Sequence, residues 1–162
     1  MTDVLVRVVD VYPYRRLPSG EVRWLVLRRA TGRAYAGQWR VVGGKIGPDE
    51  TAHAAARREL AEETGAAADA PLWAIPSVNA FYEWTHDRVN LVPAFAAEVA
   101  ADPVLDDEHD AFAWLSADEA ATRLDWPEPR RLLRLADETL RRGVPPELWI
   151  ESPKPPDVSG RG

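Results

Sequence analysis

One alanine-rich helix near the middle of the chain constrains the fold more than any other feature. The sequence predicts this helix over about residues 51–64, with Asp49 or Thr51 as its N-cap and Gly65 as its stop. Its small alanines leave a narrow side along which the helix can approach its neighbours closely. We therefore expect the rest of the protein to pack against that side.

Three carboxylates share the side that the alanines occupy. At about 100° per residue, Glu59, Glu62 and Glu63 fall within one sector of roughly 100°. They lie in the last turns of the helix, where the helix dipole disfavours each negative charge by roughly 0.3–1 kcal/mol. Glutamates on a helix usually form a solvated surface. A divalent cation between these carboxylates would make each unfavourable charge term favourable, so we expect a metal site here.

The same segment resembles the Nudix box, G-x5-E-x7-R-E-U-x-E-E-x-G-U, where U is a bulky aliphatic residue. The residues that match it are Gly44, Glu50, Arg58, Glu59, Leu60, Glu62, Glu63 and Gly65. Ala66 departs from the pattern at the last aliphatic position, which affects the packing of the loop after the helix. The matching positions all lie within one short segment, so the resemblance to the Nudix hydrolase family is specific.

The resemblance implies an α/β fold, a Nudix-type α/β/α sandwich with a mixed β-sheet. It also implies a site for Mg²⁺ or Mn²⁺, with Glu59 and Glu63 as direct ligands and Glu62 as a ligand or a support for one. The backbone of Gly44 would lie beside the metal and the phosphates. Hard divalent ions prefer carboxylate oxygens, which agrees with this assignment.

Three further box residues have expected roles by the same resemblance. Glu50 and Arg58 would brace the geometry of the loop and the helix, and Arg58 would belong to the catalytic set. Gly65 would serve a structural role at the end of the helix.

A further carboxylate, from outside the box, is expected to bind metal or to act as general base. The best candidate is Glu108, with Asp106 and Asp107 as competitors, while His109 is expected to fix the loop by hydrogen bonding. The pattern E-H-x-A-x-x-W-L that begins at Glu108 resembles bacterial dATP/dihydroneopterin triphosphate pyrophosphohydrolases. It is also similar to asymmetric dinucleoside tetraphosphate hydrolases.

Substrate contacts are expected from two arginines and a few aromatic residues. Arg28 or Arg29, at the end of a predicted strand, is a candidate for holding phosphate, although one of two neighbours on a strand faces the other way. Trp39 and Tyr82 are candidates for stacking a base. Aromatic residues at strand spacing more often belong to a core. The position of Tyr82, 16 residues beyond the box, keeps the dinucleoside polyphosphate branch open.

The remaining pattern predicts strands separated by turns, and two more helices near the C-terminus. The expected strands cover residues 4–11, 23–29, 39–43, 72–85, 89–99 and 110–115, with a turn over residues 12–20. A capping box from Ser116 to Glu119 opens one helix. The last helix is expected over residues 127–142. Because there is no regular βαβ alternation, these elements favour a mixed sheet with helices on its faces.

Composition sets the limits of the domain and excludes several kinds of site. The 162 residues fit one domain, which we place at residues 1–144, followed by a Pro/Gly-rich tail at residues 145–162 that is expected to be disordered. There are no cysteines, so thiolate sites and cysteine nucleophiles are excluded. A net charge of −6 argues against nucleic acid as a partner, and no apolar run is long enough to cross a membrane. We expect a cytoplasmic monomer or homodimer that acts on a small nucleotide.

These observations favour a nucleoside triphosphate pyrophosphohydrolase that releases a nucleoside monophosphate and pyrophosphate. The alternative within enzymes is a dinucleoside polyphosphate (Ap4A-type) hydrolase. A module that senses a nucleotide without cutting it is a third possibility. Such modules typically lack box glutamates, and all of them are present in this chain.

Overall fold

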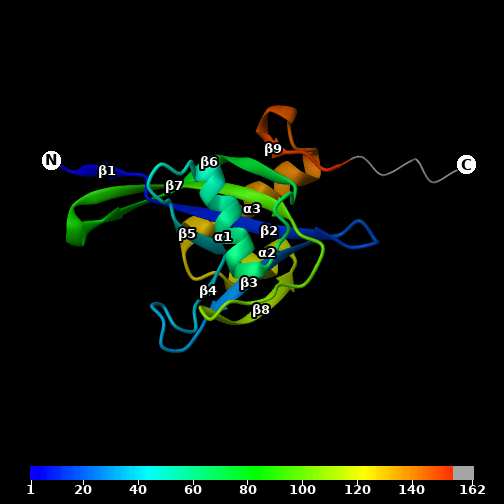
Figure 1. Ribbon diagram of the computed structural model, residues 1–162, viewed down its shortest axis with the longest axis horizontal. Coiled ribbons are helices and arrows are strands. Elements are labelled where there is room, and N and C mark those ends of the chain that lie inside the picture. The colour runs from blue at the N-terminus through cyan, green and yellow to red at the C-terminus, as the bar shows by residue number, and fades with distance from the viewer. Residues whose placement is uncertain (155–162) are drawn as a thin grey trace, which may run out of the picture.

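The computed structural model describes residues 1–154, which form one mixed β-sheet with helices on both faces (Figure 1). The strands of this sheet are β1 (Asp3–Leu5), β2 (Val8–Arg16), β3 (Val22–Arg29), β4 (Trp39–Arg40), β5 (Val42–Lys45), β6 (Leu72–Glu83), β7 (Arg88–Glu98), β8 (His109–Leu115) and β9 (Trp149–Glu151). The helices are α1 (Ala52–Thr64), α2 (Ala117–Arg123) and α3 (Pro127–Arg142), with short 3₁₀ turns η1 (Trp84–His86) and η2 (Pro146–Leu148).

The sheet is built around a parallel pair, β2 and β7, within the order β4-β3-β2-β7-β6-β9. The first half of β2 pairs with β5 and its second half with β3, so β5 and β3 follow one another along the same edge of β2. β8 pairs antiparallel with β3, and β1 pairs in parallel with the start of β7. Both parallel and antiparallel ladders are present, as the irregular order of elements in the sequence predicts.

The two faces of the sheet carry separate hydrophobic cores, because successive strand residues point to opposite sides. Val9, Val11 and Leu25 pack with α1 on one face. Tyr12 and Trp24 pack with α2 and α3 on the other. In Figure 1, α1 lies in front of the sheet and α2 and α3 lie behind it. The expected α/β sandwich around a mixed sheet is confirmed.

The expected turn over residues 12–20 is wrong in its first part. β2 continues to Arg16, and the chain turns only around Leu17–Gly20. Pro13 suggested a turn, but a proline removes only one donor from a ladder, and Tyr12 and Tyr14 on either side of it are fully buried. Burial of these two rings on the α2/α3 face outweighs the local preference for a turn.

The expected start of the tail at Pro145 is also wrong. Residues 149–151 form β9, which pairs with β6 at Leu72 and Trp73. The ring of Trp149 lies 6.4 Å from the ring of Trp73. The composition around residue 150 is rich in proline, so the contact made by this single tryptophan could not be predicted from it. The rest of the predicted tail, residues 155–162, lies outside the described residues.

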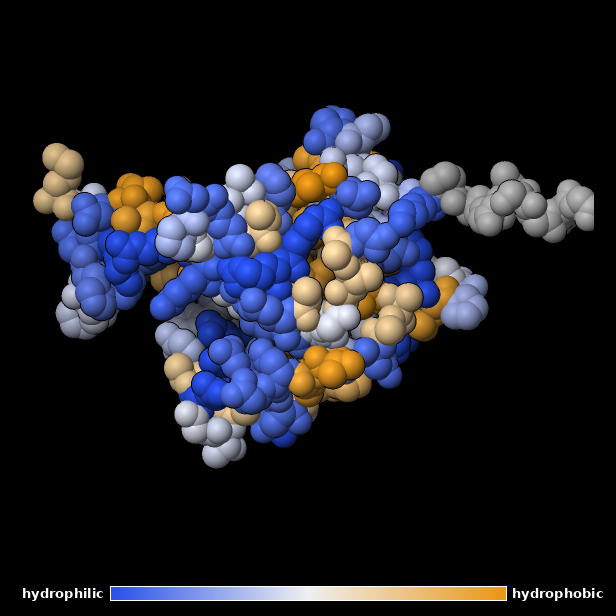
Figure 2. Space-filling model, viewed as in Figure 1, coloured by the Kyte–Doolittle hydropathy of each residue, from blue (hydrophilic) through white to orange (hydrophobic). Residues whose placement is uncertain are grey.

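The β6–β7 hairpin projects beyond the helices, with β1 alongside it (Figure 1). Figure 2 shows a notch between this hairpin and the segment that carries β4 and β5. The hairpin exposes several hydrophobic side chains, among them Phe81, Tyr82 and Trp84. No described helix is long and apolar enough to cross a membrane.

Candidate metal and phosphate site

Helix α1 sets the depth of each box glutamate. Its N-cap is Thr51, which accepts a hydrogen bond from the Ala54 N–H, and it ends at Gly65 in the left-handed conformation (φ 72°). Ala55, Ala56 and Leu60 are buried against the sheet, as the alanine side predicts. The same side carries Glu59 and Glu63, which are buried at 9% and 4% exposure, whereas Glu62 at its margin is exposed.

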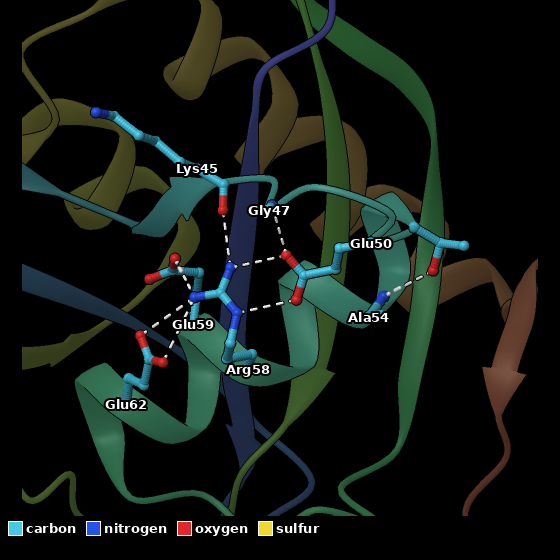
Figure 3. A network of polar contacts seen from close by, with 8 residues as sticks. Lys45, Gly47, Glu50, Ala54, Arg58, Glu59 and Glu62 are labelled. Carbon is cyan, nitrogen blue, oxygen red and sulfur yellow. Dashed lines mark hydrogen bonds and ion pairs between the residues drawn. The ribbon is translucent and has the colours of Figure 1, made fainter.

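Arg58 connects the loop before α1 to the carboxylates of the helix (Figure 3). Its Nε and Nη2 each donate to Glu50 at 2.9 Å, and Nη2 also donates to the carbonyl of Lys45 at 2.8 Å. Its Nη1 donates to Glu59 at 2.7 Å and to Glu62 at 3.3 Å. Arg58 therefore supplies the positive charge nearest to these glutamates.

Glu50 is fixed from two sides. Besides Arg58, the backbone N–H of Gly47 donates to its carboxylate at 2.7 Å. The Arg58 hydrogen bonds and then the Gly47 bond lower the pKa of Glu50 to about 2, so this carboxylate stays ionised. The resulting ion pair holds the loop over residues 45–50 against the helix.

Gly44 leaves the space that Glu59 occupies. A Cβ placed on Gly44 would overlap the carboxylate of Glu59, so any other residue here would displace that carboxylate from its present position. Burial raises the pKa of Glu59, while Arg58 opposes this effect. The carboxylate thus lies directly against the backbone of β5.

Glu63 is the most deeply buried of the three helix glutamates. The backbone N–H of Gly43 donates to it, but its Oε2 has no hydrogen-bond partner among residues 1–154. Burial, followed by the charges of Asp106 and Glu59, raises its pKa to about 9. A buried carboxylate oxygen that faces other carboxylates and lacks a donor is a site that a cation would stabilise.

The loop before β8 brings a second group of carboxylates toward α1. The His109 imidazole is buried, its Nδ1 lies 2.9 Å from Asp106, and its Nε2 lies 4.0 Å from Glu63 Oε2. Glu108 accepts a hydrogen bond from Arg29 at 2.7 Å. Its charge also raises the pKa of both Glu59 and Glu63, which places it across from the helix.

Within the part of the chain that the structure describes, no three acidic or histidine side chains are arranged as a ready cation site. The ion pairs explain this, because Arg58 holds Glu59 and Glu62 while Arg29 holds Glu108. The donor set itself fits a hard divalent ion, since it consists of carboxylate oxygens around the unpartnered oxygen of Glu63. Metal binding would require these carboxylates to rotate away from the arginines.

The structure brings together some of the predicted substrate residues. Arg28 donates to Asp110 at 2.7 Å, and its guanidinium lies 5.9 Å from the ring centroid of Trp39. Arg29 points to Glu108 instead, because neighbouring strand residues face opposite sides. Tyr82 is separate from both. It lies on the projecting hairpin, where its hydroxyl donates to Asp87 at 2.8 Å.

A second polar group, on the other face of the sheet at β5, was not predicted from the sequence. Asp10 accepts a hydrogen bond from the Asn79 amide at 3.1 Å, and the hydroxyl of the buried Tyr12 lies nearby. An aspartate in the middle of the apolar strand VVDVY was the available signal. A carboxylate on the inward face of an apolar strand is costly even when half-buried, and its presence therefore indicates a specific use.

The model of the NUDIX domain matches residues 5–136 of this chain. The chain belongs to the Nudix family. Its fold and its box, in which Ala66 is the one departure from the pattern, are those of Nudix hydrolases. The expected family is thus confirmed.

Solved structures show the same fold in both enzyme groups that the sequence resembles. An Ap4A hydrolase from C. elegans has a TM-score of 0.69 and 22% identity, covering 84% of this chain and 98% of that chain. The E. coli dihydroneopterin triphosphate pyrophosphohydrolase has a TM-score of 0.66 and 23% identity, covering 83% and 96%. At these identities the likeness shows the fold and leaves the substrate open.

A curated relative is an octanoyltransferase from Myxococcus xanthus. It is 33% identical over 125 residues, which cover 72% of this chain and 32% of the relative. The chain thus spans about a third of the length of that protein.

Proposed function

We propose that this protein is a Mg²⁺-dependent nucleoside triphosphate pyrophosphohydrolase that releases a nucleoside monophosphate and pyrophosphate. The observation that carries this proposal is a buried oxygen of Glu63 that has no partner in the described part of the chain and lies beside Glu59 and the glycine pair of β5. An acidic protein needs local cations to bind a polyphosphate, and this arrangement supplies the ligands for them.

Glu59, Glu62 and Glu63 would hold the metal, with Glu108 approaching from the opposite loop and the Gly44 backbone beside it. The bound metal would neutralise the phosphates and lower the pKa of a water. Arg58 and Glu50 position the helix and loop, and Arg58 balances the glutamates until they rotate. Without its metal, Glu63 retains a proton at neutral pH because its pKa is about 9, and it releases that proton when it becomes a ligand.

Arg28 and Arg29 are the proposed phosphate contacts. Both are paired with carboxylates, Asp110 and Glu108, that a phosphate would displace. Displacement at Arg29 has a second consequence, because it frees Glu108 to accept a proton from the attacking water. Binding of the substrate phosphate to Arg29 would then free the Glu108 carboxylate, the proposed general base, in the same step.

The test is product analysis with Mg²⁺ in ¹⁸O-labelled water over a panel of nucleoside triphosphates, dinucleoside polyphosphates and nucleotide sugars. We expect nucleoside monophosphate and pyrophosphate, with one labelled oxygen in one of the two products. Preferential cleavage of a dinucleoside tetraphosphate would move the protein to the alternative enzyme class. Nucleotide binding without any cleavage would indicate a sensing module.

A further inference from the structure

A polar group on the α2/α3 face of the sheet combines the half-buried Asp10 with the fully buried Tyr12. Asp10 and Tyr12 lie two residues apart on β2, so their side chains share one face of the sheet. The Asp10 carboxylate accepts a hydrogen bond from Asn79 through Oδ2 at 3.1 Å, while no side chain within residues 1–154 donates a hydrogen bond to its Oδ1. Because one residue separates them on the strand, the two side chains are neighbours on this face, and the charge of Asp10 contributes to raising the pKa of Tyr12.

The Tyr12 hydroxyl is an unpartnered buried group. The residue has 0% exposure, and its Oη has no hydrogen-bond partner among residues 1–154. Burial likewise raises the pKa of Asp10, to about 6. Asp10 itself is only half-buried, so a carboxylate oxygen that a ligand can reach lies beside a buried hydroxyl that lacks a partner within residues 1–154. This combination indicates a ligand that satisfies both groups.

The residues just before Asn79, the partner of Asp10, are bonded to α3. Asn79 follows a break in the β6–β7 ladder between Ala74 and Val78. Arg131 of α3 donates to Ser77 Oγ at 3.2 Å and to the Val78 carbonyl at 3.0 Å. These contacts connect the irregular part of β6 to α3 and fix the position from which Asn79 reaches Asp10.

The glycine pair of β5 separates this group from the box carboxylates by one strand. Gly43 pairs with Asp10 and Gly44 with Val9. A Cβ on Gly43 would lie 3.2 Å from Asp10 Oδ1, whereas a Cβ on Gly44 would overlap Glu59. Among the described strands β5 pairs only with β2, so the opposite edge of β5 has no strand beside it. A ligand could therefore cross that edge and reach both the box carboxylates and the Asp10 group.

We propose that Asp10, Asn79 and Tyr12 form a specificity site that selects a guanine-type ring, the 2-amino-4-oxopyrimidine edge, in the substrate of the proposed reaction. Ionised Asp10 accepts from adjacent N–H groups of such an edge, and the Tyr12 hydroxyl donates to its carbonyl oxygen. Adenine presents a ring nitrogen lone pair beside its amino group, which a carboxylate repels. Sites that hydrogen-bond a ligand discriminate strongly because a mismatched ligand leaves buried groups unpaired.

The test measures binding of GMP and AMP by calorimetry without metal, alongside kcat/KM for dGTP and dATP with Mg²⁺. Wild-type protein should prefer the guanine nucleotide by about tenfold or more in both measurements. Asp10→Asn should reduce this preference to about twofold or less, because it weakens binding of the guanine nucleotide and leaves binding of the adenine nucleotide unchanged. Tyr12→Phe should reduce the preference partly. The matched control is Asp137→Asn, a buried aspartate bonded to Trp24, which should keep the wild-type preference.

The inference rests on the proposed function, but the two can fail separately. Equal binding of GMP and AMP by the wild type, or equal weakening of both by Asp10→Asn, would overturn it. Hydrolysis of dGTP and dATP at equal kcat/KM would overturn it while supporting the proposed function. A guanine preference that Tyr12→Phe reduces, without hydrolysis of any triphosphate, would support the site and overturn the proposed function. Thermal melts establish that each variant is folded, and if Asp10→Asn is not, the wild-type ratio and Tyr12→Phe decide.

Discussion

Helices α1 and α3 lie on opposite faces of one sheet and distribute their charges in opposite ways. α3 has Glu128 in its first turn and Arg141 and Arg142 in its last, which is the arrangement that the helix dipole favours. α1 has no acidic residue in its first turn and no basic residue in its last, and instead carries Glu62 and Glu63 near its C-terminus. The charges of α3 stabilise that helix, whereas the glutamates of α1 oppose its dipole and are the proposed metal ligands.

The burial of these charges differs as well. Arg142 pairs with Glu138 at 2.7 Å on the exposed side of α3, where an ion pair contributes roughly 0–1 kcal/mol. Glu63 is buried, and its Oε2 has no partner among the described residues. Removing charge from α1 should therefore cost activity and no stability, whereas α3 should show neither effect at its exposed positions.

The largest expected effect is that of Glu63→Gln on turnover. We expect a loss of roughly 100-fold or more with Mg²⁺, because the substitution removes a proposed metal ligand. In metal-free buffer at pH 10, above the pKa of about 9, the variant should melt at the same temperature as the wild type or higher, since a buried charge is gone. Steady-state kinetics and thermal melts check both outcomes. Glu138→Gln on α3 is the control, and near-normal turnover in Glu63→Gln would contradict the assignment.

The second effect concerns the loop opposite α1. Glu108→Gln should lower kcat by about 100-fold with little change in substrate affinity, because the proposed general base is lost. Asp107→Asn should do little, since Asp107 pairs with Arg33 on the outer side of the loop. Comparing the kcat and KM of the two variants tests this. The reverse ranking would move the role to Asp107.

The third effect is on stability and concerns the α2/α3 face. The pKa of Asp10 is about 6 in the folded protein against 3.8 ordinarily, so the folded state binds its proton more tightly. The stabilisation that this binding provides is complete below about pH 4 and is lost as the pH rises to about 6. Asp10→Asn should therefore raise the free energy of unfolding by about 1–3 kcal/mol at pH 8, relative to its effect at pH 4.

Denaturant titrations at the two pH values measure this difference. Asp118→Asn, at a side chain that is 92% exposed, is the control and should change stability little at either pH. A difference for Asp10→Asn that stays the same at both pH values would show that its carboxyl is solvated.

The smallest expected effect is that of ending the chain after Ser152. This removes the Lys154–Asp69 ion pair, which is exposed and contributes roughly 0–1 kcal/mol. The melting temperature and activity should be unchanged within error. A chain that ends at Val144 should melt several degrees lower, because β9 and Trp149 no longer cover Trp73. Equal melting temperatures for the two truncations would show that β9 contributes nothing to stability.

The sequence alone determined the parts of this protein that depend on local spacing. The capping box from Ser116 to Glu119, the stop at Gly65 and the shared side of Glu59 and Glu63 all follow from residues within a few turns of one another. The sequence also predicted that Glu59 and Glu63 point toward the sheet, since the alanine side of the helix had to face it.

Only the tertiary structure decided what depends on distant partners. β9 forms because Trp149 meets Trp73, which is 76 residues earlier in the chain, and local composition contains no trace of that contact. Asp10 and Asn79 come together because the parallel β2–β7 pair and the β6–β7 hairpin place them on one face. The pairing of Arg29 with Glu108 arises in the same way, across β3 and β8. Long-range strand pairing sets these neighbours, and the hydrophobic pattern of a single strand does not specify which strand lies beside it.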